Sequence, residues 1–127
     1  MWQIDKFARI PIYEQVVAQV ERYVMQGVLK KDEPLPSVRT LSQEMSINPN
    51  TLQKAYAELE RRGVCYAVPG SGRFVRAEAR ERLISQQKAR LCELFALARE
   101  LRAAGVGIDE MIDCIRAASD SEGSEAK

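Results

Sequence analysis

The fold is decided by residues 35–62, which read LPSVRTLSQEMSINPNTLQKAYAELERR. The Ser37 hydroxyl can accept a hydrogen bond from the free N–H groups at the start of a helix. Apolar side chains then follow three or four positions apart at Val38, Leu41 and Met45, as on one face of a helix. The sequence therefore predicts a helix from about Ser37 to about Met45.

A second helix follows after a very short turn. Asn48 is a favourable N-cap, and Pro49 suits the first helical position because no N–H is needed there. The apolar spacing from Leu52 to Leu59 continues this helix, and Gly63 ends it. We predict the second helix over residues 49–62, with the turn at about residues 46–48.

Two short helices joined so tightly match the helix-turn-helix motif, whose second helix lies in the major groove of DNA. The outward face of the second helix is polar, and its side chains can reach base edges or phosphates: Asn50, Thr51, Gln53 and Lys54. The alternative is that these residues form only the solvated face of an amphipathic helix. The motif therefore needs support from the segments around it.

The chain before this motif is predicted to support it. Residues 1–9 form a short arm in which Trp2, Ile4 and Phe7 are expected to pack against the body of the domain. Pro11 then opens a helix with one broad apolar face, and Gly27 closes it. This first helix is interpreted as a scaffold.

The chain after Gly63 changes to two short β-favouring segments on either side of Pro69-Gly70-Ser71-Gly72. This order predicts a β-hairpin, and a hairpin directly after a helix-turn-helix is a wing, here residues 64–76. Glycines at the tip leave room for the backbone to approach a groove wall, and Arg73 could enter the minor groove or bind a phosphate. The alternative is that the glycines serve only the turn.

Residues 77–118 are predicted to form two more helices. Gln87 interrupts their apolar stripe, so we expect a short contact between helices and not a long coiled coil. Two such helices cannot bury both stripes alone, and we predict a homodimer in which a second copy covers Ile84, Leu91, Leu94, Phe95, Ala98, Leu101, Ile108, Met111, Ile112 and Ile115. The alternative is that the helices fold back onto their own winged domain. Residues 119–127, SDSEGSEAK, are predicted to be a disordered tail.

Composition argues against several classes of function. The 127 residues include no histidine, which removes the commonest general base and the Ser–His and Cys–His pairs. Cys65, Cys92 and Cys114 are odd in number and widely spaced, so we expect buried small hydrophobes and neither disulfides nor a zinc site. We therefore predict that the protein is not an enzyme and uses no metal or cofactor.

Charge and hydropathy point to a protein that works on nucleic acid away from membranes. Residues 1–76 contain eleven Lys and Arg against eight Asp and Glu, a net charge of +3, while residues 77–127 contain eight against ten, a net charge of −2. This asymmetry is small, but its basic half coincides with the predicted winged helix. No apolar run approaches the roughly 18 residues of a membrane helix, and the N-terminus lacks the order of a signal peptide. A cytoplasmic location is expected.

Several motifs in this order resemble the GntR family of bacterial transcription regulators. They are residues 11–15 (PIYEQ), 35–39 (LPSVR), 48–51 (NPNT) with 54–56 (KAY), 59–60 (LE) before the glycine, and 70–72 (GSG) with 74–75 (FV). The short two-helix C-terminal part resembles the YtrA subfamily. The resemblance implies a winged helix-turn-helix that binds a palindromic operator as a dimer, usually to repress, often upstream of genes for ATP-driven transporters.

The resemblance also assigns roles to particular residues. It implies that Arg39 contacts a phosphate or base, that Asn50 and Thr51 lie at contact positions of the recognition helix, and that Gly72 lies at the wing tip. Many family members carry arginines where Pro49 and Gln53 stand here, so their base preference is not transferred to this chain. The full predicted DNA-contact set is Ser37, Arg39, Asn48, Asn50, Thr51, Gln53, Lys54, Tyr56, Gly70, Gly72 and Arg73.

The predicted fold class is mainly α with a small β-hairpin. It comprises a winged helix-turn-helix domain over residues 1–76, a two-helix dimerisation region over 77–118 and the tail over 119–127. The predicted function is a sequence-specific DNA-binding regulator that acts as a repressor on an operator in double-stranded DNA. A winged helix that binds only proteins is the alternative, and it would favour an apolar recognition face. The sequence leaves a small-molecule effector open, since the chain is too short for a large ligand-binding domain.

Overall fold

The computed structural model describes residues 2–125, and the chain divides into two compact units, Met1–Gln86 and Gln87–Lys127. We call them the N-terminal unit and the C-terminal unit. The fold is mainly helical with a single two-stranded antiparallel hairpin among the described residues, as predicted. Within residues 2–125, no helix combines the length and the apolar character that crossing a lipid bilayer requires.

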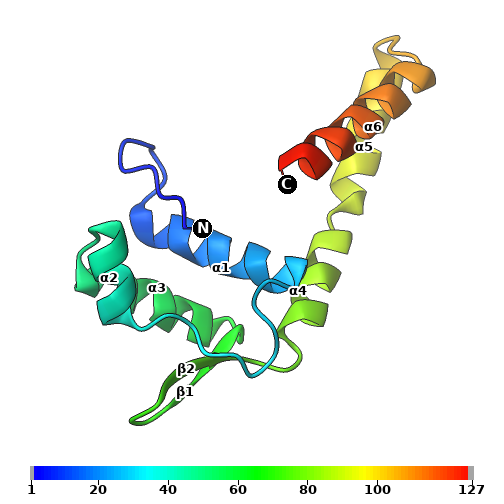
Figure 1. Ribbon diagram of the computed structural model, residues 1–127. Helices are drawn as coiled ribbons and strands as arrows, with labels where there is room; N and C mark the ends of the chain where they lie inside the picture. The colour runs from blue at the N-terminus through cyan, green and yellow to red at the C-terminus, as the bar shows by residue number, and fades with distance from the viewer. Residues whose placement is uncertain (1, 126–127) are drawn as a thin grey trace. The chain divides into compact units, whose positions relative to one another are not determined.

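Three helices form the body of the N-terminal unit (Figure 1). Helix α1 spans Ile12–Gln26 and ends at Gly27, whose φ of 80° is left-handed. Helix α2 spans Val38–Met45, and α3 spans Pro49–Arg61 and packs against both other helices. All three lie where the apolar spacing and the capping residues predict them.

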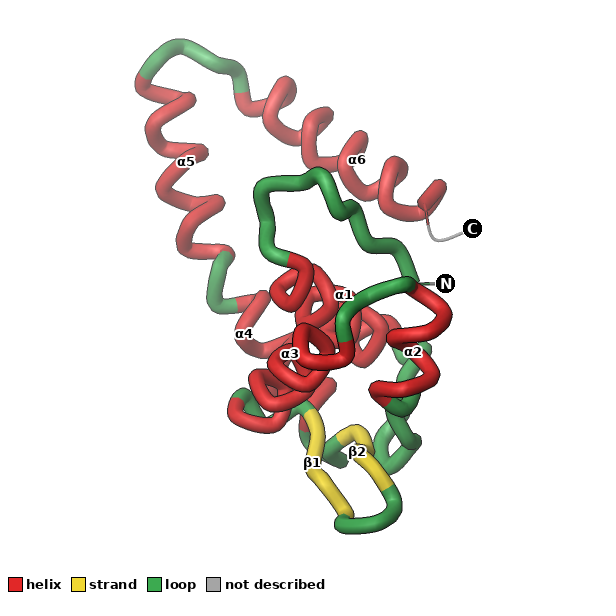
Figure 2. Tube along the Cα trace, turned by 90° about the vertical axis from the view of Figure 1, so that its left-hand side faces the viewer, coloured by secondary structure: helices red, strands yellow, loops and turns green. Residues whose placement is uncertain are grey.

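The hairpin consists of β1, Cys65–Val68, and β2, Gly72–Val75, paired in the register Cys65↔Val75 to Val68↔Gly72. It projects from the helices in both Figure 1 and Figure 2. The link before α2 lies along β2, where the Leu35 N–H donates to the Arg73 carbonyl at 2.8 Å. The wing is therefore fastened to the segment that leads into the helix-turn-helix.

The core of the N-terminal unit extends beyond the predicted boundary at residue 76. Helix α4 spans Ala79–Lys88 and buries Ala79 and Leu83 in the same core as α1 and α3. The Arg80 Nε donates to the Met25 carbonyl in the last turn of α1 at 3.1 Å. The Arg82 guanidinium lies so close to Gly63, at the end of α3, that a Cβ there would be 2.6 Å from its nitrogen. Helix α4 up to Gln86 is thus part of the N-terminal unit.

The C-terminal unit contains α5, Leu91–Ala103, and α6, Ile108–Glu125. Helix α4 ends before α5 begins, so the predicted stripe across Ile84 and Leu91 does not lie on one helix. The sequence predicts a disordered tail from residue 119, whereas α6 continues to Glu125. Extending a formed helix fixes one residue per added hydrogen bond, which explains why a polar, solvated end can continue it. Residues 126 and 127 lie outside the described residues.

The N-terminal arm only partly follows its prediction. Trp2 and Ile4 pack against the core, and the Trp2 ring meets Tyr23 edge-on at 5.3 Å between centroids. Phe7 was also expected to pack, but its side chain is 99% exposed. The reason is that the chain turns away from α1 between Asp5 and Ala8, where the Ala8 N–H donates to the Asp5 carbonyl at 3.3 Å.

Candidate nucleic-acid interface

The corner between α2 and α3 is fixed by local hydrogen bonds. The Thr40 N–H donates to the Ser37 Oγ at 3.0 Å and caps α2, and the Asn50 N–H donates to the Asn48 Oδ1 at 2.8 Å and caps α3. Between them Ser46 adopts a left-handed φ of 54°, and Ile47 turns into the core. The corner therefore has a defined shape, and the start of α3 stays uncovered.

The outward face of α3 carries the predicted polar side chains. Asn50, Gln53 and Lys54 are exposed, and Thr51 is half-buried. The opposite face buries the residues that anchor the helix: Leu52, Ala55, Tyr56 and Leu59. Amide side chains on an exposed helix can donate and accept at base edges, so this face can read DNA sequence.

Lys54 has a second neighbour that the sequence did not indicate. Its Nζ lies 4.0 Å from the ring centroid of Tyr13, in the first turn of α1. A cation over an aromatic face is attracted by the ring's quadrupole, which orients the lysine along the edge of α3 next to α1. Tyr13 thereby belongs to the candidate surface. No sequence spacing could reveal this contact, because it joins two helices.

The remaining exposed members of the predicted set surround α3. Arg39 is exposed in the first turn of α2. Ser37 and Asn48 are also exposed, but their side-chain oxygens act as helix caps. Gly70 and Gly72 lie at the exposed hairpin turn with φ values of 79° and 109°, a backbone conformation that favours glycine.

Tyr56 was predicted to contact DNA, and this prediction is wrong. Its side chain is 1% exposed, and its hydroxyl donates to the Pro36 carbonyl at 2.7 Å. Burial raises the pKa of this hydroxyl, so it stays protonated and keeps donating. The sequence already indicated that Tyr56 is buried, because Tyr56 shares the apolar spacing of Leu52 and Leu59.

Arg73 was expected to extend from the wing into a groove, but it turns toward α3. Its Nε lies 3.9 Å from the Glu60 Oε2, and its guanidinium lies 5.6 Å from the centre of the Tyr56 ring. That Nε is buried and has no hydrogen-bond partner within the described part of the chain. Alternation along β2 explains the orientation, because Arg73 is two residues before the buried Val75 and shares its face.

An ion-pair network one helical turn after Lys54 connects the C-terminal half of α3 to α1. Glu58 accepts hydrogen bonds from Arg61 and Arg62, and the Arg62 Nη1 also donates to Glu21 of α1 at 3.2 Å. The hydrogen bonds from the two arginines lower the Glu58 pKa from 4.5 to about 2. This network holds the C-terminal half of the helix whose N-terminal half carries the polar face.

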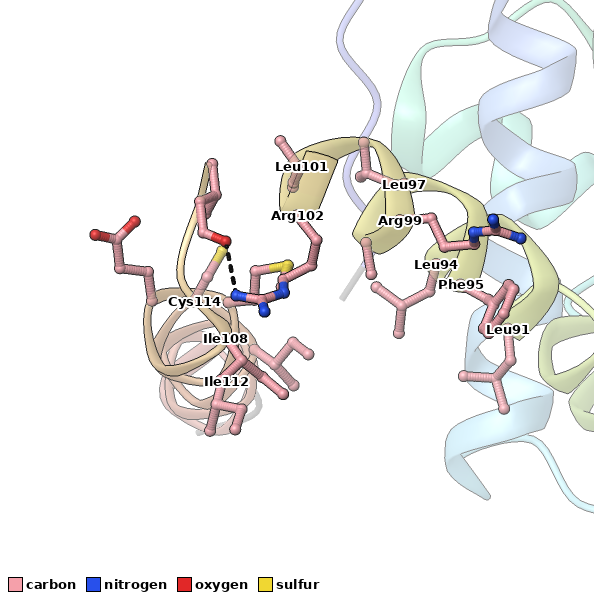
Figure 3. Close-up of a pocket in the computed structure, with 15 residues that line it drawn as sticks. Leu91, Leu94, Phe95, Leu97, Arg99, Leu101, Arg102, Ile108, Ile112 and Cys114 are labelled. Atoms are coloured by element: carbon pink, nitrogen blue, oxygen red, sulfur yellow. Dashed lines mark hydrogen bonds between the residues drawn. The ribbon is translucent and has the colours of Figure 1, made fainter. Parts of the chain in front are cut away.

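The C-terminal unit presents the opposite kind of surface. An open apolar groove of about 890 Å³ lies between α5 and α6. Figure 3 shows side chains of both helices along it. Every predicted dimerisation residue except Ile84 lines the groove, together with residues that the heptad spacing missed, among them Leu97 and Val106.

Two further predictions concern Ile84 and the three cysteines. Ile84 belongs to α4 and therefore to the N-terminal unit. The expectation of buried cysteines holds for Cys65 and is wrong for Cys92 and Cys114, which are exposed on α5 and α6. The groove thus includes only the residues after the break between α4 and α5.

The comparisons with known proteins agree with this geometry. The model for bacterial regulatory proteins of the gntR family matches residues 12–75, which run from α1 to the end of the wing. The chain is also 35% identical over 117 residues to the HTH-type transcriptional repressor YtrA of Bacillus subtilis (strain 168), covering 91% of this chain and 90% of that protein. The chain belongs to the GntR family.

Solved structures of GntR-type proteins have the same architecture. A GntR family transcriptional regulator from Listeria monocytogenes has a TM-score of 0.72 at 29% identity, covering 90% of this chain and 98% of that one. The structure of AraR(DBD) in complex with its operator has a TM-score of 0.51 at 28% identity, covering 59% of this chain and 90% of that one. The protein is a GntR-family DNA-binding transcriptional regulator that binds operator DNA, and it is not an enzyme.

Proposed function

We propose that this GntR-family regulator is a cytoplasmic repressor that binds a palindromic operator as a homodimer. The observation that carries the proposal is the start of α3, which is capped, uncovered and lined by polar side chains on a fixed corner. A helix with these properties is suited to the major groove. The similar Bacillus subtilis protein is named a repressor, which supports repression over activation for this protein.

The residues of this surface have two proposed roles: some recognise base edges, and others bind the phosphate backbone. Asn50 and Gln53 read base edges, because an amide can make paired hydrogen bonds to adenine. Arg39 and Lys54 supply charge to phosphates, which fixes the register without reading sequence. The glycine turn at the wing tip lets backbone approach the duplex, while Arg73 keeps the wing against α3.

The apolar groove supports the homodimer. Leu91, Phe95 and Ile108 are 62%, 65% and 57% exposed, and no side chain of α5 is buried. A two-helix unit without a buried core needs a partner surface to be stable. A second copy is the simplest partner, since a twofold axis lets the same apolar surface cover itself. Two α3 helices would then meet half-sites one DNA turn apart, about 34 Å.

The resulting mechanism is occlusion of promoter DNA. A dimer that occupies the operator with both recognition helices and both wings obstructs RNA polymerase. Any small-molecule effector would act by changing the spacing or tilt of the two helices. The groove itself is assigned to the partner copy and not to an effector.

The test uses a duplex that the full-length protein selects from a random-sequence pool, and a scrambled duplex of the same composition. Asn50→Ala should weaken binding to the selected duplex by about 1–3 kcal/mol and leave binding to the scrambled duplex unchanged. Arg39→Ala should weaken both and flatten the dependence of affinity on salt. Gln43→Ala, an exposed polar position of α2, is the matched control. Equal losses on both duplexes for Asn50→Ala would contradict the reading role.

A further inference from the structure

The chain has an exposed aromatic side chain that neither the core nor the proposed interface uses. Phe7 is 99% exposed in the segment that precedes α1, and Ile10 is 56% exposed. Between them lies Arg9, and before them Lys6, so two cations accompany the two apolar side chains. We call residues 6–10 the N-terminal loop.

The N-terminal loop is held in a defined conformation by Gln15 of α1. The side-chain amide of Gln15 donates to the carbonyls of Asp5 and Ile10, at 2.9 and 2.8 Å, and therefore joins both ends of the loop. Its Oε1 accepts from the Asp5 N–H at 2.9 Å. The Asp5 carboxylate accepts from the Phe7 N–H at 2.9 Å, which closes the turn. Phe7 is thus presented to solvent by a fixed turn.

The segment before the N-terminal loop is anchored in the same way one helical turn later. The Gln3 N–H donates to the Gln19 Oε1 at 2.9 Å, and the Gln19 side-chain amide donates back to the Gln3 carbonyl. Gln19 is 8% exposed, and Trp2 and Ile4 pack against the core on either side. The N-terminal loop therefore cannot swing away from α1 without breaking the hydrogen bonds to Gln15 or the contacts around Gln19.

The N-terminal loop lies beside the corner of the helix-turn-helix. The Lys6 Nζ donates to the Ser46 carbonyl at 3.0 Å, and Ser46 is two residues before the N-cap of α3. In Figure 1 the loop, the corner and the start of α3 lie on one side of the N-terminal unit, and this side faces the viewer in Figure 2. The hairpin lies at the opposite end of that side. The N-terminal loop and the wing therefore flank the start of the recognition helix.

We infer that the N-terminal loop is a second DNA-contacting element, which binds the duplex on the flank of α3 away from the wing. Arg9 and the remaining donors of Lys6 contact phosphates, and Phe7 packs against sugars or enters the minor groove. Lys6 and Arg9 outnumber the one carboxylate of the turn, Asp5, so residues 5–10 carry a net charge of +1. The contact of Lys6 with Ser46 places this charge next to the start of α3, where the phosphates of a bound duplex would lie. Apolar wedges next to cations are a common way of holding the minor groove.

The experiment uses the full-length protein and a selected duplex of about 30 base pairs, roughly three helical turns. Arg9→Ala should lower affinity about 3- to 10-fold on both selected and scrambled duplexes and flatten the salt slope by about one charge. Phe7→Ala should lower affinity on the selected duplex by a similar factor. The matched controls are Arg22→Ala and Val28→Ala, which remove an exposed cation and a 47% exposed apolar side chain elsewhere in the unit.

A direct readout accompanies the affinities. A photo-crosslinking phenylalanine analogue at position 7 should crosslink to DNA, while the same analogue at position 28 should not. This inference is overturned if Phe7→Ala and Arg9→Ala both bind like the controls, or if position 7 crosslinks only to an added RNA polymerase. Asn50→Ala is measured in parallel. Its loss on the selected duplex reports the proposed function separately, so either idea can fail while the other stands.

Discussion

The two units of this regulator solve the problem of burying apolar side chains in different ways. The N-terminal unit encloses its own core, with Val16, Val20, Leu52 and Leu59 all at 0% exposure. The C-terminal unit has helices of comparable length, yet α5 buries no side chain and its leucines line an open groove. The first unit buries its apolar side chains within a single chain, whereas the second leaves them exposed, which is the basis for the proposed partner copy.

The largest effect should come from a charge in the groove. Phe95→Asp places a carboxylate where the proposed partner packs, so the protein should become monomeric and bind its operator at least about 100-fold more weakly, because the two half-sites are no longer linked. Sedimentation velocity and gel-shift titration measure the two effects. Ala96→Asp is the control, since Ala96 is the next residue of α5 and does not line the groove. A Phe95→Asp protein that still sediments as a dimer would rule out the assigned interface.

A leucine truncation should have different consequences in the two units. Leu59→Ala removes a fully buried side chain and should lower the free energy of unfolding by about 2–5 kcal/mol. Leu97→Ala removes a side chain that is 51% exposed in one chain, so its effect should depend on protein concentration, as expected when stability is linked to assembly. Thermal unfolding at several concentrations distinguishes the two. A concentration-independent loss for Leu97→Ala would mean that the groove is closed within one chain.

A smaller effect should separate core residues from DNA contacts within the N-terminal unit. Tyr56→Phe leaves the Pro36 carbonyl without its donor and should cost about 1–2 kcal/mol of stability. DNA affinity measured well below the melting temperature should not change. Tyr66→Phe is a useful comparison, because it removes a hydroxyl that donates to Asp32 at the surface. Weaker DNA binding by folded Tyr56→Phe would restore Tyr56 to the interface.

The smallest effect should appear at acid pH. The Glu58 pKa is lowered from 4.5 to about 2 by Arg61 and Arg62, so the ionised carboxylate stabilises the fold above pH 4.5, and this stabilisation is lost as the pH falls toward 2. Glu58→Gln should therefore be slightly less stable than the parent at neutral pH, and the difference should vanish near pH 2. Urea unfolding across this range measures it. A difference that stays constant with pH would exclude the ion pairs as its cause, and Glu44→Gln controls for the loss of an exposed charge.

The sequence predicted the elements of the N-terminal unit well because their signals are local. Ser37, Asn48 and Pro49 define helix ends through bonds to their own neighbours. The direction in which individual side chains point was harder to predict from the sequence. For Arg73, however, the alternation with Val75 already indicated the inner face of its strand. The position of Phe7 had only a partial local signal. Asp5 closes the turn two residues before it, but both ends of the loop are held by Gln15, which lies on α1.

The C-terminal unit was predicted less accurately for a related reason. Heptad counting treated Ile84 and Leu91 as one stripe, but α4 stops at Lys88, and its Ala79 and Leu83 pack in the core of the N-terminal unit. Periodicity describes which residues share a face and not which core that face joins. The polar Gln87, which interrupts the apolar stripe, already indicated that the residues before it and after it could pack in different cores.

The two arginines of α4 have a practical consequence for exchanging parts between relatives. Arg80 donates to a carbonyl in the last turn of α1, and Arg82 lies against Gly63 at the end of α3, so a chimaera joined just after the wing would lose both contacts and the buried Leu83. Joined between Lys88 and Leu91, the same chimaera would keep every one of these contacts. The short break before α5 is therefore the position at which a designed exchange of the C-terminal unit should leave the DNA-binding unit intact.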